Sequence, residues 1–477
     1  MTLVRKIAYN TFISAGARII GVALSLVNIG LIARYLGQEG FGEYSLILAF
    51  LSIFNILADL GLYSLMTREI SRPGADEKKI ASNIFTLRVA ILLFFLILAT
   101  ASIWLFPYSS RVKVGVAIVT ISILFLSASQ VLMGIFQKYL RTDKAALSEV
   151  IGRAVQLGLV SLFIYLDSGF FALLVALTVG ALVIFILNFL FARKYVALTL
   201  AFDFSYWKEV IKVALPIALS IVLTLIYFKI DSIFLSLKFI NRSSANPISD
   251  VGIYNIPYKV LEGLIFFPSM FVGLIFPLLS KFAVSGIEQF KKIFQKILDI
   301  LIVIIVPLVI GLFMLSLPIV ILIGGKEFAV SSPVLKILSF AIGLIFLGNL
   351  FGNAIIALNK QKVGAWIYFI GMAFNIITNL IFIPKYSYIG AASTTLATEF
   401  LVTILMFCLI SKTIHYLPSF KIILKAIFAG LFMGFFLYYF QAHNLFIVVG
   451  LGAAIYFGIL YLIKGIKKEE VALLLKR

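Results

Sequence analysis

Long apolar runs, separated by short polar connections, divide almost the whole chain and leave few folds open to it. A helix needs about 20 mostly apolar residues to cross the hydrocarbon core of a bilayer. Fourteen such runs can be counted, with approximate bounds 7–33, 41–66, 80–106, 113–137, 145–166, 169–191, 213–237, 251–279, 293–315, 332–357, 363–383, 388–411, 421–440 and 445–464. The sequence therefore predicts an all-α membrane protein with about fourteen transmembrane helices.

Composition and charge favour the same class. Of the 477 residues 62% are hydrophobic and 13% are charged, and the mean hydropathy is +1.14. A net charge of +20 would suggest nucleic acid as the partner of a soluble protein. Here the basic residues gather in short connections, which is typical of membrane orientation. We expect a multi-pass protein of the cytoplasmic membrane that binds no nucleic acid. Both termini are expected in the cytoplasm.

Two blocks of the chain resemble one another. Residues 40–45 (GFGEYS) reappear as 250–255 (DVGIYN), and residues 360–406 roughly echo 141–187. Six spans separate the copies, and because six is even, both copies enter the membrane in the same direction. They should be related by an axis along the membrane normal, as in transporters built from parallel repeats.

The repeat predicts three parts. Residues 1–201 form an N-terminal lobe of spans 1–6, and 202–416 form a parallel C-terminal lobe of spans 7–12. Residues 417–477 add a helix pair, spans 13 and 14, and a cytoplasmic tail. Residues 202–212 read as an amphipathic linker at the cytoplasmic surface.

Charged residues inside the spans are the candidate site, because each costs about 2.5–3.5 kcal/mol near the bilayer centre. The candidates for substrate binding are Arg18, Arg88, Arg153, Lys229 and Lys259. The candidates for ion coupling, or for counter-ions, are Asp59, Asp231, Glu262 and Glu399. The excess of deep cations favours an anionic cargo, since Arg grips phosphate or carboxylate with paired N–H groups.

Each candidate has a structural alternative. Arg18 lies roughly 16 Å from the cytoplasmic end of its span, at a rise of 1.5 Å per residue. It either has a functional role or forms a structural ion pair, for instance with Asp59. Arg153 follows Glu149 by four residues, and Glu262 follows Lys259 by three. Both spacings allow a pair on one helical face.

Several kinds of chemistry have no sequence signature. There is no Walker A, HExxH or GxSxG pattern, Cys408 is the single cysteine, and His415 and His443 are the two histidines. The connections are too short for a nucleotide-binding or catalytic domain. We expect that the chain has no metal site, needs no cofactor and is not an enzyme.

Four blocks in order resemble a known family: residues 33–44 (ARYLGQEGFGEY), 59–70 (beginning DLGL), 322–338 (beginning LIGGKEF) and 383–399 (beginning IPKY). They are similar to the polysaccharide-exporter flippases of the multidrug/oligosaccharidyl-lipid/polysaccharide superfamily, the O-antigen and teichuronic-acid type.

The resemblance implies two six-helix lobes around a cationic central cavity, alternating access, and a polyprenyl-pyrophosphate-linked glycan as cargo. The family often has an Arg in span 1, where Arg18 stands, while its other basic positions vary. Glycan polymerase and glycosyltransferases of the same pathway are the expected partners of a chain that works as a monomer among membrane lipids.

The function expected is therefore flipping of lipid-linked oligosaccharide or polysaccharide repeat units. Two alternatives stay open. One is a cation-coupled exporter of small drugs, and the other is a membrane-embedded glycan polymerase or ligase.

Overall fold

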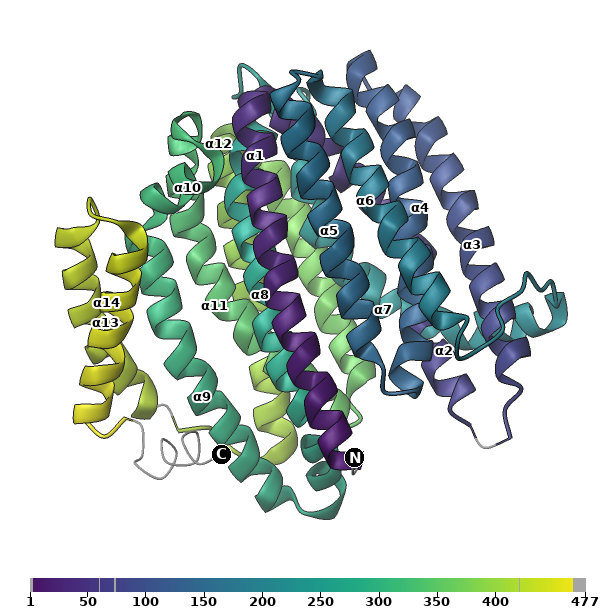
Figure 1. Cartoon of the computed structure of the whole chain (residues 1–477). Helices are drawn as coiled ribbons and strands as arrows, with labels where there is room; N and C mark the ends of the chain where they lie inside the picture. The colour runs from purple at the N-terminus through teal and green to yellow at the C-terminus, as the bar shows by residue number, and fades with distance from the viewer. Residues whose placement is uncertain (1–2, 60, 73, 420, 466–477) are drawn as a thin grey trace. The chain divides into compact units, whose positions relative to one another are not determined.

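The computed structural model describes residues 3–59, 61–72, 74–419 and 421–465, except for the side chains of 3–13, 15, 64, 213 and 215–227. All regular structure within these residues is helical (Figure 1). The helices are α1 (Leu3–Asp59), α2 (Leu62–Ile70), α3 (Glu77–Ser102), η1 (Ile103–Leu105), α4 (Ser110–Lys138), α5 (Thr142–Tyr165), α6 (Gly169–Ala192), α7 (Phe204–Ser236), α8 (Pro247–Ser285), α9 (Ile287–Met314), α10 (Ser316–Gly324), η2 (Lys326–Ser331), α11 (Ser332–Ala357), α12 (Gln361–Ile414), α13 (Lys421–Phe440) and α14 (Leu445–Leu462).

The predicted all-α membrane class is confirmed. Eleven helices among the described residues are long and apolar enough to cross a membrane. Two of them, α1 and α12, are of double length and are interrupted at Gly37 (φ 67°) and Ser387 (φ 47°). The predicted spans 1 and 2 lie within α1 or at its end, and spans 11 and 12 lie within α12. The count of fourteen spans stays a prediction, as does the cytoplasmic tail, which lies mostly beyond the described residues.

The connections differ from expectation in two places. The second apolar run ends as a helix at Asp59, and Leu62–Ile70 forms the separate helix α2. The region around Gly324-Gly325, expected as a connection, holds the short helices α10 and η2. Gly325 has a φ of 87° between them, a conformation that glycine adopts at little cost.

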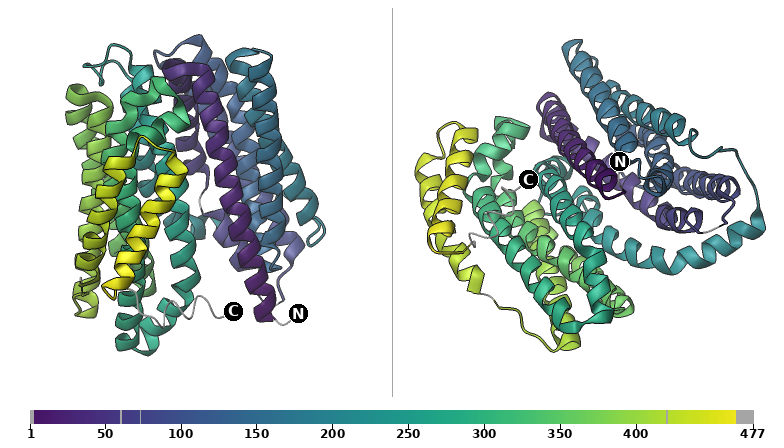
Figure 2. Two further views of the ribbon diagram at one scale, coloured as in Figure 1. Left: turned by 60° about the vertical axis from the view of Figure 1, so that its left-hand side comes forward. Right: turned by 60° about the horizontal axis from the view of Figure 1, so that its bottom comes forward.

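The helices pack into two compact units, each a bundle (Figure 2). The first comprises Met1–Leu237 and Asn246–Gly252, and the second comprises Lys238–Ala245 and Ile253–Arg477. Helix α7 packs against α1 in the first unit, and α13 packs against α9 in the second. The compact units therefore divide the chain at different places from the repeat-based boundary expected at 201/202.

The repeated motif lies at a close approach of two helices. Gly42 of α1 and Gly252 of α8 are both within the first unit. A Cβ added to Gly42 would lie 1.9 Å from the carbonyl oxygen of Ile248, and one added to Gly252 would lie 2.1 Å from that of Gln38. Both obstacles are backbone atoms, so neither can rotate away. The two copies of the motif meet through their equivalent glycines, which explains why both copies need glycine there.

Helix α7 begins with a capped first turn. Asp203 accepts a hydrogen bond from the backbone N–H of Tyr206 at 3.0 Å, and its other oxygen lies 3.0 Å from Nζ of Lys79. The hydrogen bond from Tyr206, followed by the one from Lys79, lowers the pKa of Asp203. Both interactions favour the ionised carboxylate.

Acid should therefore loosen the start of α7. Because the folded pKa is depressed, the cap contributes fully above the unfolded value of about 3.9 and is lost as pH falls through the lower folded pKa. Trp207 reports on this turn once Trp104 and Trp366 are replaced by Phe. We expect an acid transition in Trp207 fluorescence that disappears in Asp203→Asn. Asp76→Asn, which removes the titratable carboxylate at the matching cap of α3, should keep it. A transition that survives in Asp203→Asn would contradict the assignment.

Candidate functional site

A polar stripe runs along one face of α1. Its members are Ser14, Arg18, Gly21, Ser25 and Asn28, spaced three or four residues apart. Residues at this spacing share a helical face. Three of them contact α5: Ser14 donates to Thr142 at 2.9 Å, and the contacts of Arg18 and Ser25 are described next. The stripe therefore lies against α5, within the first unit.

Arg18, Glu149 and Arg153 form the charged centre of this stripe. Arg18 Nη1 lies 2.9 Å from Glu149 Oε2 and 3.2 Å from Oε1. Arg153 donates from Nε and Nη2 to Glu149 Oε1, both at 3.2 Å, and from Nη1 to Ser25 Oγ at 3.3 Å. Gly21 is buried where α1 faces Glu149. One carboxylate thus joins two guanidinium groups on two helices.

The cluster is cationic and accessible. It holds two positive charges and one negative charge, and the side chains of Arg18 and Arg153 are 46% and 31% exposed. Guanidinium surface is costly to leave against hydrocarbon. Groups that are charged, accessible and fixed in geometry by hydrogen bonds suit an anionic ligand with several oxygen atoms.

The pairing differs from one expectation and confirms another. The suggested ion pair of Arg18 with Asp59 was wrong. Arg18 pairs with Glu149 of α5, and Asp59 pairs with Arg88 of α3. Arg18 and Glu149 are 131 residues apart, so their contact depends on helix packing that the sequence alone does not give. The expected pair of Glu149 with Arg153 is present.

Arg88 has a different place from the other basic candidates. Its side chain is 0% exposed, and its Nη1 lies 2.9 Å from Asp59 Oδ1. The same nitrogen donates to the carbonyl oxygen of Ala58 at 2.6 Å, and Nη2 donates to Ser127 Oγ. Arg88 thus fastens the end of α1 to α3 and α4. We leave it out of the proposed ligand site, because no ligand can reach it in this conformation.

Removing the partner of Arg88 should destabilise the fold. Asp59→Asn leaves a buried guanidinium without its counter-charge, and breaking a buried pair costs 3–5 kcal/mol as an order of magnitude. Asp59 is 32% exposed, so we expect about 3 kcal/mol, the lower end of that range. Thermal unfolding in detergent measures the loss. Arg68→Gln removes an exposed ion pair with Glu69 and should change stability little. Equal effects of the two substitutions would contradict the structural role of Arg88.

The remaining basic candidates lie on α7 and α8. Lys259 Nζ lies 2.7 Å from Glu262 Oε2, with side-chain exposures of 16% and 31%, so the expected helix pair is present. Lys229 is half-buried on α7, and Asp231 beyond it is 1% exposed. The substrate-binding role of Lys229 and Lys259 stays a prediction.

Buried polar groups also gather along α12 in the second unit. Asn375 donates to Thr398 at 3.3 Å, and Asn379 donates to Asn375 at 3.0 Å. Glu399 follows Thr398 and is 4% exposed. Asn375 joins the two halves of α12 across its bend at Ser387 through its bond to Thr398, whereas the bond from Asn379 lies within the first half. The coupling or counter-ion role of Glu399 stays a prediction.

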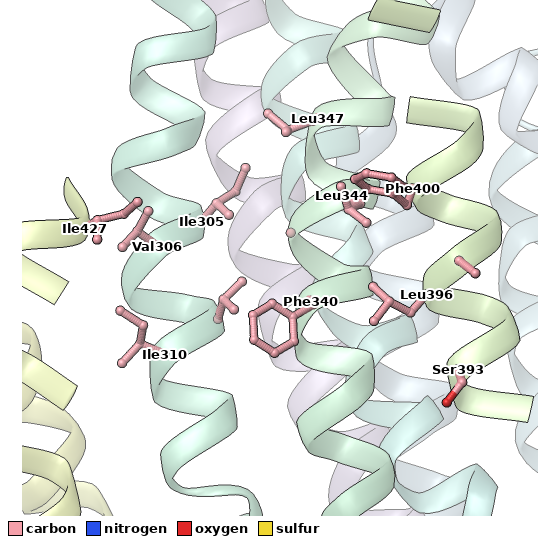
Figure 3. A pocket seen from close by; sticks show the side chains of 13 residues that line it. Ile305, Val306, Ile310, Phe340, Leu344, Leu347, Ser393, Leu396, Phe400 and Ile427 are labelled. Atoms are coloured by element: carbon pink, nitrogen blue, oxygen red, sulfur yellow. The ribbon is translucent and has the colours of Figure 1, made fainter. Parts of the chain in front are cut away.

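A second feature of the second unit is an apolar pocket of about 720 Å³. It is lined from α9, α11, α12 and α13, and Phe340 and Phe400 stand at its wall (Figure 3). Ser393 supplies the single hydroxyl among the described side chains that line it. Such a lining suits hydrocarbon and offers almost nothing to a sugar or a phosphate.

Sequence reasoning missed two members of the stripe, Ser25 and Asn28. Ser25 accepts from Arg153, and Asn28 is 2% exposed with no amide hydrogen bond among the described residues. The signal that could have found them is their helical spacing from Arg18 inside an otherwise apolar run. Asn28 and Asp231 are both buried.

The chain has curated relatives of similar length. It is 24% identical to the probable low-salt glycan biosynthesis flippase Agl15 of Haloferax volcanii over 409 residues, covering 85% of this chain and 82% of the relative. It is 24% identical to the capsular polysaccharide biosynthesis protein CapF of Staphylococcus aureus, covering 81% and 95%. It is 22% identical to a putative O-antigen transporter of Shigella flexneri, covering 82% and 94%.

Solved structures show the same fold. The lipid II flippase MurJ in an inward closed conformation matches with a TM-score of 0.75 at 16% identity, covering 95% of this chain and 98% of that one. An inward-facing multidrug resistance MATE transporter of the MOP superfamily matches with 0.65 at 16% identity, covering 84% and 98%. The apolar helices and these relatives make the chain a multi-pass membrane protein. The family model described as polysaccharide biosynthesis protein matches residues 7–283, more than half of the chain. The chain belongs to that family.

Proposed function

We propose that this protein flips lipid-linked oligosaccharide or polysaccharide repeat units across the cytoplasmic membrane, with both termini in the cytoplasm. The observation that carries the proposal is the cluster of Arg18, Glu149 and Arg153. It places accessible guanidinium groups on membrane-spanning helices of a polysaccharide biosynthesis protein. A phosphate-linked head group is the anionic cargo that such a pair of arginines would hold.

The mechanism we propose is alternating access. The head group enters beside Arg18 and Arg153, and the lipid tail stays in the bilayer, where its burial costs nothing. Lys229, on α7 of the same unit, supplies a third cation for the cargo. The substrate-binding role of Lys259, which is paired with Glu262 on α8, is a separate prediction. The deep carboxylates Glu399 and Asp231 serve as coupling groups or counter-ions. No bond is made or broken in this scheme, so the protein acts as a transporter and not as an enzyme.

Reconstitution tests the proposal. Purified protein in liposomes, given labelled lipid-linked glycans of several head groups, should accelerate transfer of label to the opposite leaflet without changing the length of the glycan. A glycan that grows during the assay would favour the polymerase or ligase alternative. Transfer of no lipid-linked substrate would contradict flipping.

The drug-exporter alternative draws on the MATE-like fold. Its usual cargo is cationic, which two arginines at the site would repel. Cells with and without the protein should therefore show the same drug-resistance profile, while surface glycan is present only with it. Changed drug resistance with unchanged surface glycan would favour the drug exporter over the flippase.

A further inference from the structure

Three large apolar side chains stand out from the segment that precedes and begins α7. Leu200 is 68% exposed, Phe202 is 61% exposed and Phe204 is 71% exposed. They occur at every second residue. We call these three residues the linker row. Exposed apolar groups in such a series mark a surface that another molecule covers.

Hydrogen bonds to α3 fix the direction of the linker row. The backbone N–H groups of the intervening residues all donate to side chains on α3: Thr199 to Ser82 at 3.1 Å, Ala201 to Thr86 at 3.0 Å, and Asp203 to Asn83 at 3.0 Å. Alternate residues of an extended chain point to opposite sides. Binding every second residue to α3 therefore turns Leu200 and Phe202 outward.

Aromatic packing holds the end of the linker row. The ring of Trp207 lies 5.9 Å from that of Phe202 and 5.2 Å from that of Phe204, between centroids. Its Nε1 donates to Asn83 at 3.2 Å. Trp side chains concentrate at the boundary between hydrocarbon and water. Asn83 lies in the second turn of α3, which places the linker row near the end of a membrane-spanning helix.

Basic side chains flank the linker row on both sides. Arg193 and Lys194 precede it, and Lys208 and Lys212 follow it, all exposed. Lys208 and Lys212 share one face of α7 with Phe204, because they are four and eight residues further on. Of the two acidic residues in 193–212, Asp203 is paired with Lys79 and Glu209 is exposed. The segment is therefore apolar at its centre and cationic at its ends.

We propose that the linker row and its four flanking cations form a binding site for anionic phospholipid. The acyl chains pack against the linker row, and the phosphate-bearing headgroup meets Lys208 and Lys212. Charge complementarity selects an acidic lipid over a zwitterionic one, since basic residues at the membrane surface attract anionic headgroups. Lipid fits better than a protein partner, because the row adjoins a membrane-spanning helix end and is framed by an interfacial Trp.

Trp207 can report on its own neighbours. With Trp104→Phe and Trp366→Phe it becomes the single tryptophan of the chain. The full-length protein is placed in phosphatidylcholine vesicles containing a fixed fraction of phosphatidylglycerol, with bromine on the acyl chains of either lipid in turn. The two brominated lipids are compared at equal mole fraction. We expect brominated phosphatidylglycerol to quench Trp207 fluorescence at least about twofold more strongly than brominated phosphatidylcholine does. The preference should fall at high salt.

Two matched variants separate a site from a general charge effect. Lys208→Gln/Lys212→Gln should reduce the preference toward equal quenching. Lys360→Gln/Lys362→Gln removes the same charge from exposed residues at the start of α12 and should leave the preference intact. Equal quenching by the two lipids in the parent, or equal effects of the two variants, would overturn the proposal. So would the absence of quenching by either lipid, which would mean that water or protein covers Trp207. The assay measures no transport, so its result stands apart from the proposed flipping.

Discussion

Arg18→Glu is expected to lower glycan export by roughly ten- to a hundredfold while protein levels stay normal. A hydrogen bond to a charged group is worth about 1.5–3 kcal/mol, and each 1.4 kcal/mol is about tenfold in binding. Reversal also turns the cluster with Glu149 and Arg153 from net positive to net negative, so that it repels an anionic head group. Surface glycan in a strain that depends on this protein measures the effect, with membrane abundance of the variant measured alongside.

Two companion variants separate ligand binding from a structural ion pair. Arg18→Lys keeps the charge but loses the paired N–H groups, and we expect it to retain partial export. Arg18→Glu combined with Glu149→Arg restores both the ion pair and the net charge. If the guanidinium at position 18 binds cargo, the exchange re-forms the ion pair without restoring export. Full export from the exchanged pair would show that Arg18 serves structure alone.

Gly42→Ala is the second change with a large expected effect. The added methyl would lie 1.9 Å from the carbonyl oxygen of Ile248, so α1 and the start of α8 must separate. Overpacking of this kind costs about 1–3 kcal/mol, occasionally more. We expect a lower melting temperature in detergent and reduced export. Gly252→Ala, with its 2.1 Å approach to Gln38, should behave alike.

Gly158→Ala on α5 is the matched control, because no heavy atom lies within 4 Å of its added methyl. Replacing a helical glycine with alanine gains about 0.5–1 kcal/mol of intrinsic helix propensity. The control should therefore melt at the same temperature as the parent or slightly higher. If Gly42→Ala and Gly158→Ala have the same melting temperature, the close approach at Gly42 does not limit the packing of α1 against α8.

Much of the fold could be predicted from hydropathy. An apolar run of span length has one stable form in lipid, a helix whose backbone groups bond to each other, so the positions of most helices followed from composition. The breaks inside α1 and α12 followed as well, because Gly37 and Ser387 lie in the gaps 34–40 and 384–387 between predicted spans. Pro384 lies three residues before the bend at Ser387. Which helices cluster together depends on side-chain fit, and α7 packs against α1 in the first compact unit. The division into lobes at 201/202 stays a prediction.

The site divided in the same way. Pairs within one helix, such as Lys259 with Glu262, follow from spacing alone. Pairs between helices do not, and the sequence offered both Arg18 and Arg88 as candidates for substrate binding. Packing sends the Arg88 side chain into the protein, where it is 0% exposed, and leaves that of Arg18 46% exposed. The apolar pattern therefore could not show which of the two arginine side chains is buried.

The distance in sequence between Arg18 and Glu149 has a consequence for how the protein is made. The first helix enters the membrane with an arginine whose partner lies 131 residues further along. At ribosomal rates of about 5–20 residues per second, that partner emerges roughly 7–26 s later. During this interval the guanidinium must stay beside water, lipid phosphate or an insertion factor, because hydrocarbon would not tolerate it. Stable insertion of the first helix thus waits for the fifth, and a truncation before α5 should leave the N-terminal segment poorly integrated.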